Sequence, residues 1–191
     1  MALPEQVRKW ATEPFYEPGG VLRAVGEVGV APIPRDSSEE WRALDGTELK
    51  QEREWLDATV FTYGVSQALG IDARIARLEE GDFDFLIGWS EDGENRICPV
   101  QLKQLVSAER NPDANLSDLL AGLAKYSGGS ETIVAVKLSR EMRFDPAELD
   151  IPEIPFRGLW FFGSSDPIGQ DWFLYGDVMR KPHFHIFRLP S

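Results

Sequence analysis

The chain has 191 residues, of which 42% are apolar and 27% are charged, and its mean hydropathy is -0.28. These values are typical of a globular protein and exclude a collagen-like, coiled-coil or mostly disordered chain. The 32 acidic and 20 basic side chains give a formal net charge of -12, which argues against a DNA-binding module that works by charge alone.

The sequence predicts a single domain with three parts. Residues 1–44 are expected to form an irregular N-terminal arm, because prolines and glycines interrupt them repeatedly. Aromatic side chains within this arm, Trp10 among them, indicate that it packs against the rest of the protein. Residues 45–140 carry the clearest alternation of helix and strand signals and form the predicted core. Residues 141–191 add a proline-rich link and C-terminal strands.

A helix is expected from about residue 45 to residue 69. Asp45 precedes Glu48 by three residues, as in a capping box, and Gly70 is suited to the C-terminal cap. One narrow arc of this helix is apolar and is predicted to be its buried face: Leu49, Leu56, Val60 and Tyr63.

Two strands joined by a turn follow this helix. In residues 81–89 the apolar side chains at alternate positions share one face, while Asp82 and Asp84 share the other. A polar turn with a glycine at residues 90–95 leads into a return strand at residues 97–105. A short strand near residues 73–78 completes an antiparallel meander.

The remaining elements predict the fold class. A second helix is expected at residues 116–126, and a β-branched run predicts a buried strand at residues 131–138. Three further strands are predicted at residues 159–162, 172–175 and 184–187. Their aromatic residues are expected to form a second small core, or else an exposed patch for a partner. This order predicts an α/β (α+β) fold, in which helices flank a central mixed β-sheet with extra C-terminal strands.

The most informative polar residues lie on the predicted hairpin. Gln101 and Lys103 flank Leu102, so both side chains point to one face of the return strand while Leu102 points into the core. If the two strands pair through the turn, Asp84 reaches the same face as Gln101 and Lys103. A carboxylate with other oxygen donors on adjacent strands suits Mg²⁺ or Mn²⁺. A lysine beside such a metal can position water and offset the charge of a phosphate.

Asp84-Phe85-Leu86-Ile87 and Gln101-Leu102-Lys103, in this order of elements, resemble the strand motifs of the PD-(D/E)XK nuclease superfamily. Proteins of that superfamily have the restriction-endonuclease-like fold. There, a helix that often carries a Glu precedes a strand with a metal-binding Asp, a strand with (Glu/Asp)-X-Lys, a helix and a further strand. The resemblance covers about residues 45–140. It implies a Mg²⁺-dependent nuclease that hydrolyses phosphodiester bonds of DNA with water as the nucleophile.

The resemblance also implies a role for each matched residue. Asp84 would bind the metal, and Lys103 would assist the attacking water. Gln101 and the carbonyl oxygen of Leu102 would complete the protein ligands, with Asp82 as a reserve ligand. Gln101 stands where an acid is usual, as it does in restriction enzymes of the Mrr type. An amide is a weaker ligand than a carboxylate, so we expect one metal ion held at lower affinity.

The helix acid can be assigned by its position around the helix. Measured from Leu49, Glu52 lies about 60° away, Glu48 about 100° away and Glu54 about 140° away on the far side. Glu52 is therefore expected to face the site, with Glu48 as the second choice.

A different class of function competes with the enzyme. Asp84, Gln101 and Lys103 can also be ordinary solvent-facing strand residues of a nuclease-fold protein with weak or no catalysis. Such a protein would act in binding, in assembly or as an inhibitor of a basic partner, which fits the net charge of -12. In either case the arm and the aromatic C-terminal strands are candidates for a homodimer interface.

Local charge separates these two interpretations. Residues 1–100 carry 20 acidic and 10 basic side chains, whereas residues 101–191 carry 12 and 10, so an anion-facing surface is expected in the second half. A basic rim around Lys103, made by Lys125, Arg140 or Arg143, favours the enzyme. An acidic rim favours the binding protein.

The expected location is the cytoplasm. The single cysteine, Cys98, cannot form an intrachain disulfide, which fits a reducing compartment. No secretory signal is apparent at the N-terminus, and no run of about 18 apolar residues predicts a membrane span. His183 and His185 share a strand face but have no third ligand near them in the sequence, so a structural role is favoured over a metal site.

Overall fold

The computed structural model describes residues 5–27, 47–78, 83–124, 131–140, 142, 149, 151, 153 and 155–191, and for residues 47–49 it describes the backbone alone. The helices are α1 (Glu5–Trp10), α2 (Pro18–Glu27), α4 (Thr47–Leu69) and α5 (Leu116–Leu123). The strands are β1 (Arg74–Arg77), β2 (Phe85–Glu91), β3 (Glu94–Leu105), β4 (Ile133–Leu138), β5 (Gly158–Ser164), β6 (Asp171–Gly176) and β7 (His183–Arg188).

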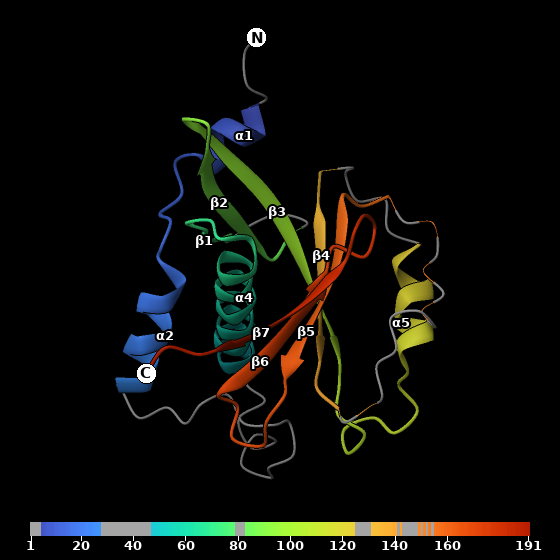
Figure 1. The fold of residues 1–191 in the computed structure, drawn as a ribbon. Coiled ribbons are helices and arrows are strands. Elements are labelled where there is room, and N and C mark those ends of the chain that lie inside the picture. The colour runs from blue at the N-terminus through green and yellow to red at the C-terminus, as the bar shows by residue number, and fades with distance from the viewer. Residues whose placement is uncertain are drawn as a thin grey trace.

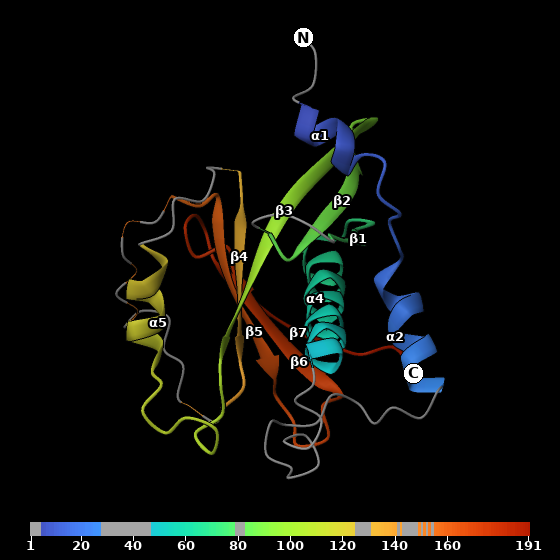
Figure 2. The same cartoon turned by 180° about the vertical axis from the view of Figure 1, so that it is seen from behind.

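All of these strands belong to one seven-stranded mixed sheet in the order β1-β2-β3-β4-β5-β6-β7. The strands β1 to β3 form an antiparallel meander, β3 to β5 run parallel, and β5 to β7 are antiparallel again. A parallel pair needs a crossover connection, and α5 lies on the one between β3 and β4. Figures 1 and 2 show α4 and α5 on opposite sides of the curled sheet. The predicted α+β class with a mixed sheet and flanking helices is confirmed.

The predicted meander is present with slightly different limits. The strand β2 begins at Phe85 instead of residue 81, and β3 begins at Glu94 instead of residue 97. Their connection turns at Asp92 and Gly93, whose φ angles of 53° and 79° are both in the left-handed region. A two-residue turn of this kind matches the twist of the strands, which explains the tight hairpin.

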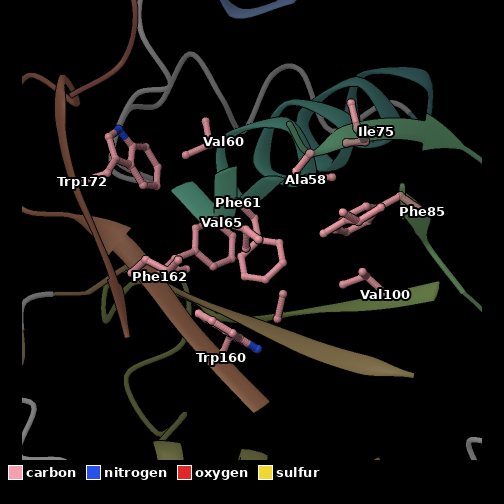
Figure 3. Close-up of a cluster of buried hydrophobic side chains, with 14 of the residues drawn as sticks. Ala58, Val60, Phe61, Val65, Ile75, Phe85, Val100, Trp160, Phe162 and Trp172 are labelled. Carbon is pink, nitrogen blue, oxygen red and sulfur yellow. The ribbon is translucent and has the colours of Figure 1, made fainter. Parts of the chain in front are cut away.

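The helix α4 is buried on two opposite arcs. Ala58, Phe61 and Val65 face the sheet, where the ring of Phe61 packs against Phe85, Trp160 and Phe162 (Figure 3). The predicted arc of Leu56, Val60 and Tyr63 lies about 180° away at 100° per residue. That arc faces α2, which packs along α4, and Tyr63 lies beside Gly19 of α2. The sequence therefore identified one of the two buried faces, while Leu49 lies outside the described side chains.

A second core fills the space between the sheet and α5. Three leucines of α5 pack there against residues on the face of β4 and β5 that is turned toward α5, such as Val134 and Phe161. The leucines are Leu116, Leu120 and Leu123. The side chain of Asn115 caps α5 by accepting the N–H of Asp118 at 2.8 Å. The aromatic residues of the C-terminal strands do not form a separate small core. Instead, Trp160, Phe162 and Trp172 belong to the core around α4, whereas Phe161 and Tyr175 lie in the core beside α5, because alternate residues of a strand face opposite sides of the sheet.

The N-terminal arm is not irregular throughout, as the sequence had indicated, because it contains α1 and α2. Pro18 occupies the first position of α2, where its missing N–H costs nothing. Glu17 accepts the N–H groups of Gly19 and Gly20, so the two glycines lie in a capped first turn rather than in a break. The arm does pack on the sheet, since Tyr16 forms a bridge with Ile75 of β1.

Two smaller features concern chemistry and environment. Burial raises the pKa of the Cys98 thiol to about 11, which makes it an unreactive thiol near neutral pH. Within the described ranges, no helix combines the length and the apolar character that crossing a bilayer requires.

One buried ion pair joins α4 to the centre of the sheet. The ammonium of Lys137 on β4 donates to a carboxylate oxygen of Asp57 on α4 at 2.7 Å, and the two side chains are only 9% and 4% exposed. The same ammonium lies 6.0 Å from the centre of the Trp172 ring. Two charges this deeply buried are tolerable only as partners, so the pair fixes α4 against β4.

Replacing Asp57 alone should therefore be severe. We expect Asp57→Ala to lower the free energy of unfolding by about 3–5 kcal/mol, because it leaves the Lys137 ammonium buried without a counter-charge. The double variant Asp57→Leu with Lys137→Met should recover most of that loss, since it removes both charges and keeps apolar volume. Urea unfolding of the three proteins measures both effects. A single variant within about 1 kcal/mol of the parent would show that the pair does not hold α4 in place.

Candidate functional site

Asp84 lies directly before β2, beside the middle of β3. Its backbone N–H donates to the carbonyl oxygen of Val100 at 3.0 Å. Its carboxylate oxygen Oδ2 accepts the backbone N–H of Leu102 at 2.6 Å. The structure thus brings the Asp84 carboxylate to the Gln101-Leu102-Lys103 segment of β3. The contact lies just before the start of β2 at Phe85.

The carbonyl oxygen of Leu102 is directed toward the same place. The N–H of Ser139 donates to the carbonyl of Leu105 at 3.0 Å, so the odd-numbered residues of β3 turn their backbone groups toward β4. Backbone groups alternate sides along a strand, and those of Leu102 therefore point away from β4, toward Asp84. This main-chain oxygen is accordingly oriented to act with the carboxylate.

Gln101 and Lys103 lie on one face of β3, because Val100 and Leu102 on either side pack into the core around α4. Phe85 pairs with Val100 in the register, and the N–H of Asp84 donates to the carbonyl oxygen of the same Val100, so Asp84 lies beside the residue that precedes Gln101. Both polar side chains are half-buried. The hydrogen bond from the Leu102 N–H holds the Asp84 carboxylate against this segment, and the charge of Lys103 acts on it.

The electrostatics of Asp84 are set by its surroundings. Although part of the residue remains exposed, desolvation of its carboxyl group raises the pKa of Asp84 above the ordinary value. The Leu102 N–H and the positive charges of Lys103 and Lys50 act in the opposite direction without cancelling this effect. A raised pKa means that the anionic form is less stable here than in water. A bound cation would offset that cost.

An open cleft of about 470 Å³ adjoins this carboxylate, between the first half of α4, the end of β1 and the start of β2. Asp84 and Glu54 are both among the residues that line it. Its walls also include Gln51, Trp55 and Arg77. This volume is in the range of small-molecule and nucleotide sites.

Glu54, and not Glu52, shares the cleft with Asp84. Counting 100° per residue, Glu54 lies within about 20° of the centre of the stripe of α4 that faces the sheet, whereas Glu52 lies about 150° from it. Glu52 is instead 63% exposed and pairs with Arg77 at 3.0 Å. The sequence prediction used the arc that faces α2 as its reference, and for this reason it placed Glu54 on the far side. Glu48, the second choice, lies outside the described side chains.

The cations nearest the cleft are balanced by acids. Arg77 pairs with Glu52 and also lies over the ring of Trp55, 5.8 Å from its centre. Lys50 pairs with Glu54 at 3.7 Å. These pairs leave the described wall of the cleft neither strongly basic nor strongly acidic.

Of the three residues that could form a basic rim around Lys103, the structure describes Arg140. The guanidinium of Arg140 donates to the carbonyl oxygens of Val106, Asn111 and Ala114, and so holds the loop that follows β3. Arg140 therefore acts as a structural residue. Lys125 and Arg143 lie outside the described residues.

The oxygen donors fit a hard divalent cation. Mg²⁺ takes one or two carboxylates, accepts neutral oxygens and keeps several waters. Asp84 and the Leu102 carbonyl can supply such a set, together with the side-chain oxygen of Gln101, whereas Glu54 lines the cleft from α4 and none of residues 101–103 is among the lining residues. Among the described residues no group of three or more His, Cys, Asp or Glu is gathered as a closed metal site would require. Asp82, the reserve ligand, lies outside that part of the chain.

The raised pKa makes a prediction about stability. For a carboxyl whose pKa is higher in the folded state, the linked stability is present below its unfolded value, near 3.8, and is lost as the pH rises through the folded value. Asp84→Asn keeps an oxygen that can accept the Leu102 N–H but removes the charge. We therefore expect the variant to gain thermal stability relative to the parent as the pH is raised from 3 to 7 in metal-free buffer. Thermal unfolding across that range measures the difference, and a variant that becomes relatively less stable with rising pH would contradict it.

Comparisons with known proteins do not add to this geometry. No protein-family model matches the chain, and neither a curated protein nor a solved structure does.

Proposed function

We propose that this chain is a Mg²⁺-dependent nuclease that hydrolyses phosphodiester bonds of DNA with water as the nucleophile. The observation that carries the proposal is the 2.6 Å hydrogen bond from the Leu102 N–H to the Asp84 carboxylate. It joins the aspartate before one strand to the Gln101-Leu102-Lys103 segment of the next. That juxtaposition is what a carboxylate-and-lysine phosphodiesterase site requires.

Each residue has a distinct task in this proposal. Asp84 supplies the anionic ligand, and the oxygens of Gln101 and Leu102 supply neutral ones. When bound, Mg²⁺ lowers the pKa of water and polarises the phosphate. Glu54 accepts a hydrogen bond from a water in the cleft and so orients it toward Asp84.

Lys103 acts on the substrate. Its ammonium is close enough to Asp84 to lower the pKa of that carboxyl, and so it lies in the same electrostatic environment. There it orients the attacking water and offsets negative charge that develops on the phosphate in the transition state. An ammonium performs this task without needing to change its protonation state.

The order of elements supports the same proposal at the level of the fold. The helix α4, the Asp84 strand β2, the Gln101-Leu102-Lys103 strand β3, the helix α5 and the strand β4 occur in the order seen in PD-(D/E)XK nucleases. We therefore extend the proposal to a restriction-endonuclease-like core made by these elements. The amide at position 101 is the departure from the usual motif, and it predicts weak cation binding.

A second candidate function follows from the charges. The described carboxylates of the cleft number two, Asp84 and Glu54, and the whole chain carries -12. A nuclease-fold protein with these properties can instead bind a basic protein as an assembly factor or inhibitor. The two functions differ in whether the Asp84 site takes up a cation.

Cation binding is therefore the decisive measurement. We expect Mg²⁺ and Mn²⁺ to bind the parent protein at one site, and Asp84→Ala to weaken that binding at least about tenfold by removing the anionic ligand. Titration calorimetry and Mn²⁺ resonance spectra report the occupancy. Asp72→Ala is the matched control, because Asp72 also precedes a strand but pairs with Arg74 on the surface. Folded parent protein that binds neither ion at millimolar concentration would favour the binding function.

Cleavage assays test the roles within the cleft. With DNA and RNA in single- and double-stranded form, we expect Glu54→Gln to lower Mg²⁺-dependent cleavage about 10–100-fold, because it removes the acid that orients water in the cleft. Glu52→Gln should leave the rate within about twofold, since Glu52 is not among the lining residues and its ion pair with Arg77 is exposed to solvent. Equal losses in the two variants would show that Glu54 has no special position.

A further inference from the structure

The two edge strands of the sheet differ in how well they are protected from pairing with another strand. The strand β1 at one edge has only four residues, its outer residues are Arg74 and Arg77, and the backbone of Tyr16 pairs with Ile75. Short length, charge and a covering segment are the usual protections of an edge strand. The strand β7 at the other edge has six residues and no such cover in the described part of the chain (Figure 1).

The exposed face of β7 is apolar. Phe184 is 57% exposed and Ile186 is 60% exposed. They share their face with Phe173 and Tyr175 of β6, which lie opposite them in the register. The rings of Phe173 and Phe184 are stacked with centres 5.6 Å apart, so the patch is already ordered. Phe187, on the other face of β7, is buried in the core around α4. Its burial fixes which face of β7 is exposed.

The outward backbone groups of β7 can be identified from its pairing. The N–H of Leu189 donates to the carbonyl oxygen of Gln170 at 2.9 Å, which makes this a hydrogen-bonded pair. In an antiparallel ladder every second pair is of this kind, so the odd-numbered residues of β7 bond to β6. The N–H and C=O groups of Phe184 and Ile186 therefore point away from β6 at the edge of the sheet, while their exposed apolar side chains stand on its face.

The charge of this region suits a second copy of the chain. Residues 171–188 carry two acids, Asp171 and Asp177, and three bases, so their formal charge is +1 in a chain of -12. Asp171 is held by the guanidinium of Arg188 at 2.7 and 2.8 Å, which leaves the end of the strand without net charge. Two acidic copies can approach through this hairpin without the repulsion that the rest of the surface would produce.

We propose that the protein forms a two-fold symmetric dimer in which β7 pairs antiparallel with β7 of a second copy. With His185 on the symmetry axis, Phe184 of each copy lies opposite the partner's Ile186. The outward N–H and C=O groups of these residues then form two hydrogen-bonded pairs, and the sheet continues through both copies. A two-fold axis makes one strand complementary to itself, so no other surface is required. This inference does not depend on the cation site.

The oligomeric state tests the proposal. We expect sedimentation velocity over a concentration series to show a monomer–dimer equilibrium for the parent, and Ile186→Lys to raise the dissociation constant at least about tenfold. Ile168→Lys is the matched control, because Ile168 is 62% exposed but lies in the turn between β5 and β6. It should dimerise as the parent does. A parent that is monomeric at every concentration, or variants that dissociate equally, would overturn the proposal.

A proline at the same position separates pairing of the backbone from contact between apolar faces. Ile186→Pro removes an outward N–H and leaves the bonds to β6 intact, so it should also prevent dimerisation. Circular dichroism of each variant establishes that it is folded. A folded Ile186→Pro protein that still dimerises would show that the copies do not meet strand to strand, and would overturn the proposed mode.

Discussion

The helix α4 must be covered on two opposite sides, and the rest of the fold is arranged to provide that cover. One side carries Phe61 and its neighbours, which need the aromatic wall of the sheet, and the other carries Val60 and Tyr63, which need α2. Burying a large apolar side chain contributes about 1.5–3 kcal/mol, so neither side can be left in water without a large loss. The curl of the sheet, which brings β1 and β7 toward the same helix, follows from this requirement.

The same constraint explains why the cleft lies where it does. The stripe of α4 that faces the sheet begins at Glu54 and Gln51, before the helix reaches its fully buried part. The cleft lies between this part of the helix, the end of β1 and the residues just before β2, which starts at Phe85. Asp84 occupies the shortened edge and takes the Leu102 N–H that a longer β2 would have used. A polar cleft thus arises from the mismatch between the helix and the strand beside it.

The parts of the fold that could be predicted from the sequence depend on neighbours along the chain. Alternation around Phe85 and Ile87 predicts β2, Gly93 predicts the turn, and the leucines of residues 116–123 predict α5. The parts that could not be predicted depend on distant partners. Asp57 and Lys137 are 80 residues apart and become an ion pair only when α4 lies on β4.

The assignment of the helix acid shows the same limit at the site. The apolar arc of Leu56, Val60 and Tyr63 predicts a buried face of the helix. It does not predict which other element covers that face. The covering partner proved to be α2, so an acid chosen by distance from this arc is turned away from the sheet. Glu54 could have been preferred from the sequence only by noticing that Ala58, Phe61 and Val65 continue its own stripe toward a second apolar surface.

A bound divalent cation would reduce two unfavourable electrostatic energies at the proposed site. Desolvation makes the anionic form of Asp84 costly, and a chain of -12 repels a polyphosphate substrate. At physiological salt that repulsion extends only about 8 Å, so the charges close to Asp84 decide whether a phosphate can approach. The nearest cations are Lys50 and Lys103, and Lys50 is already paired with Glu54. A cation at Asp84 lowers the cost of its charge and adds to the positive charge that Lys103 offers a phosphodiester, so the activity we propose depends on the ion.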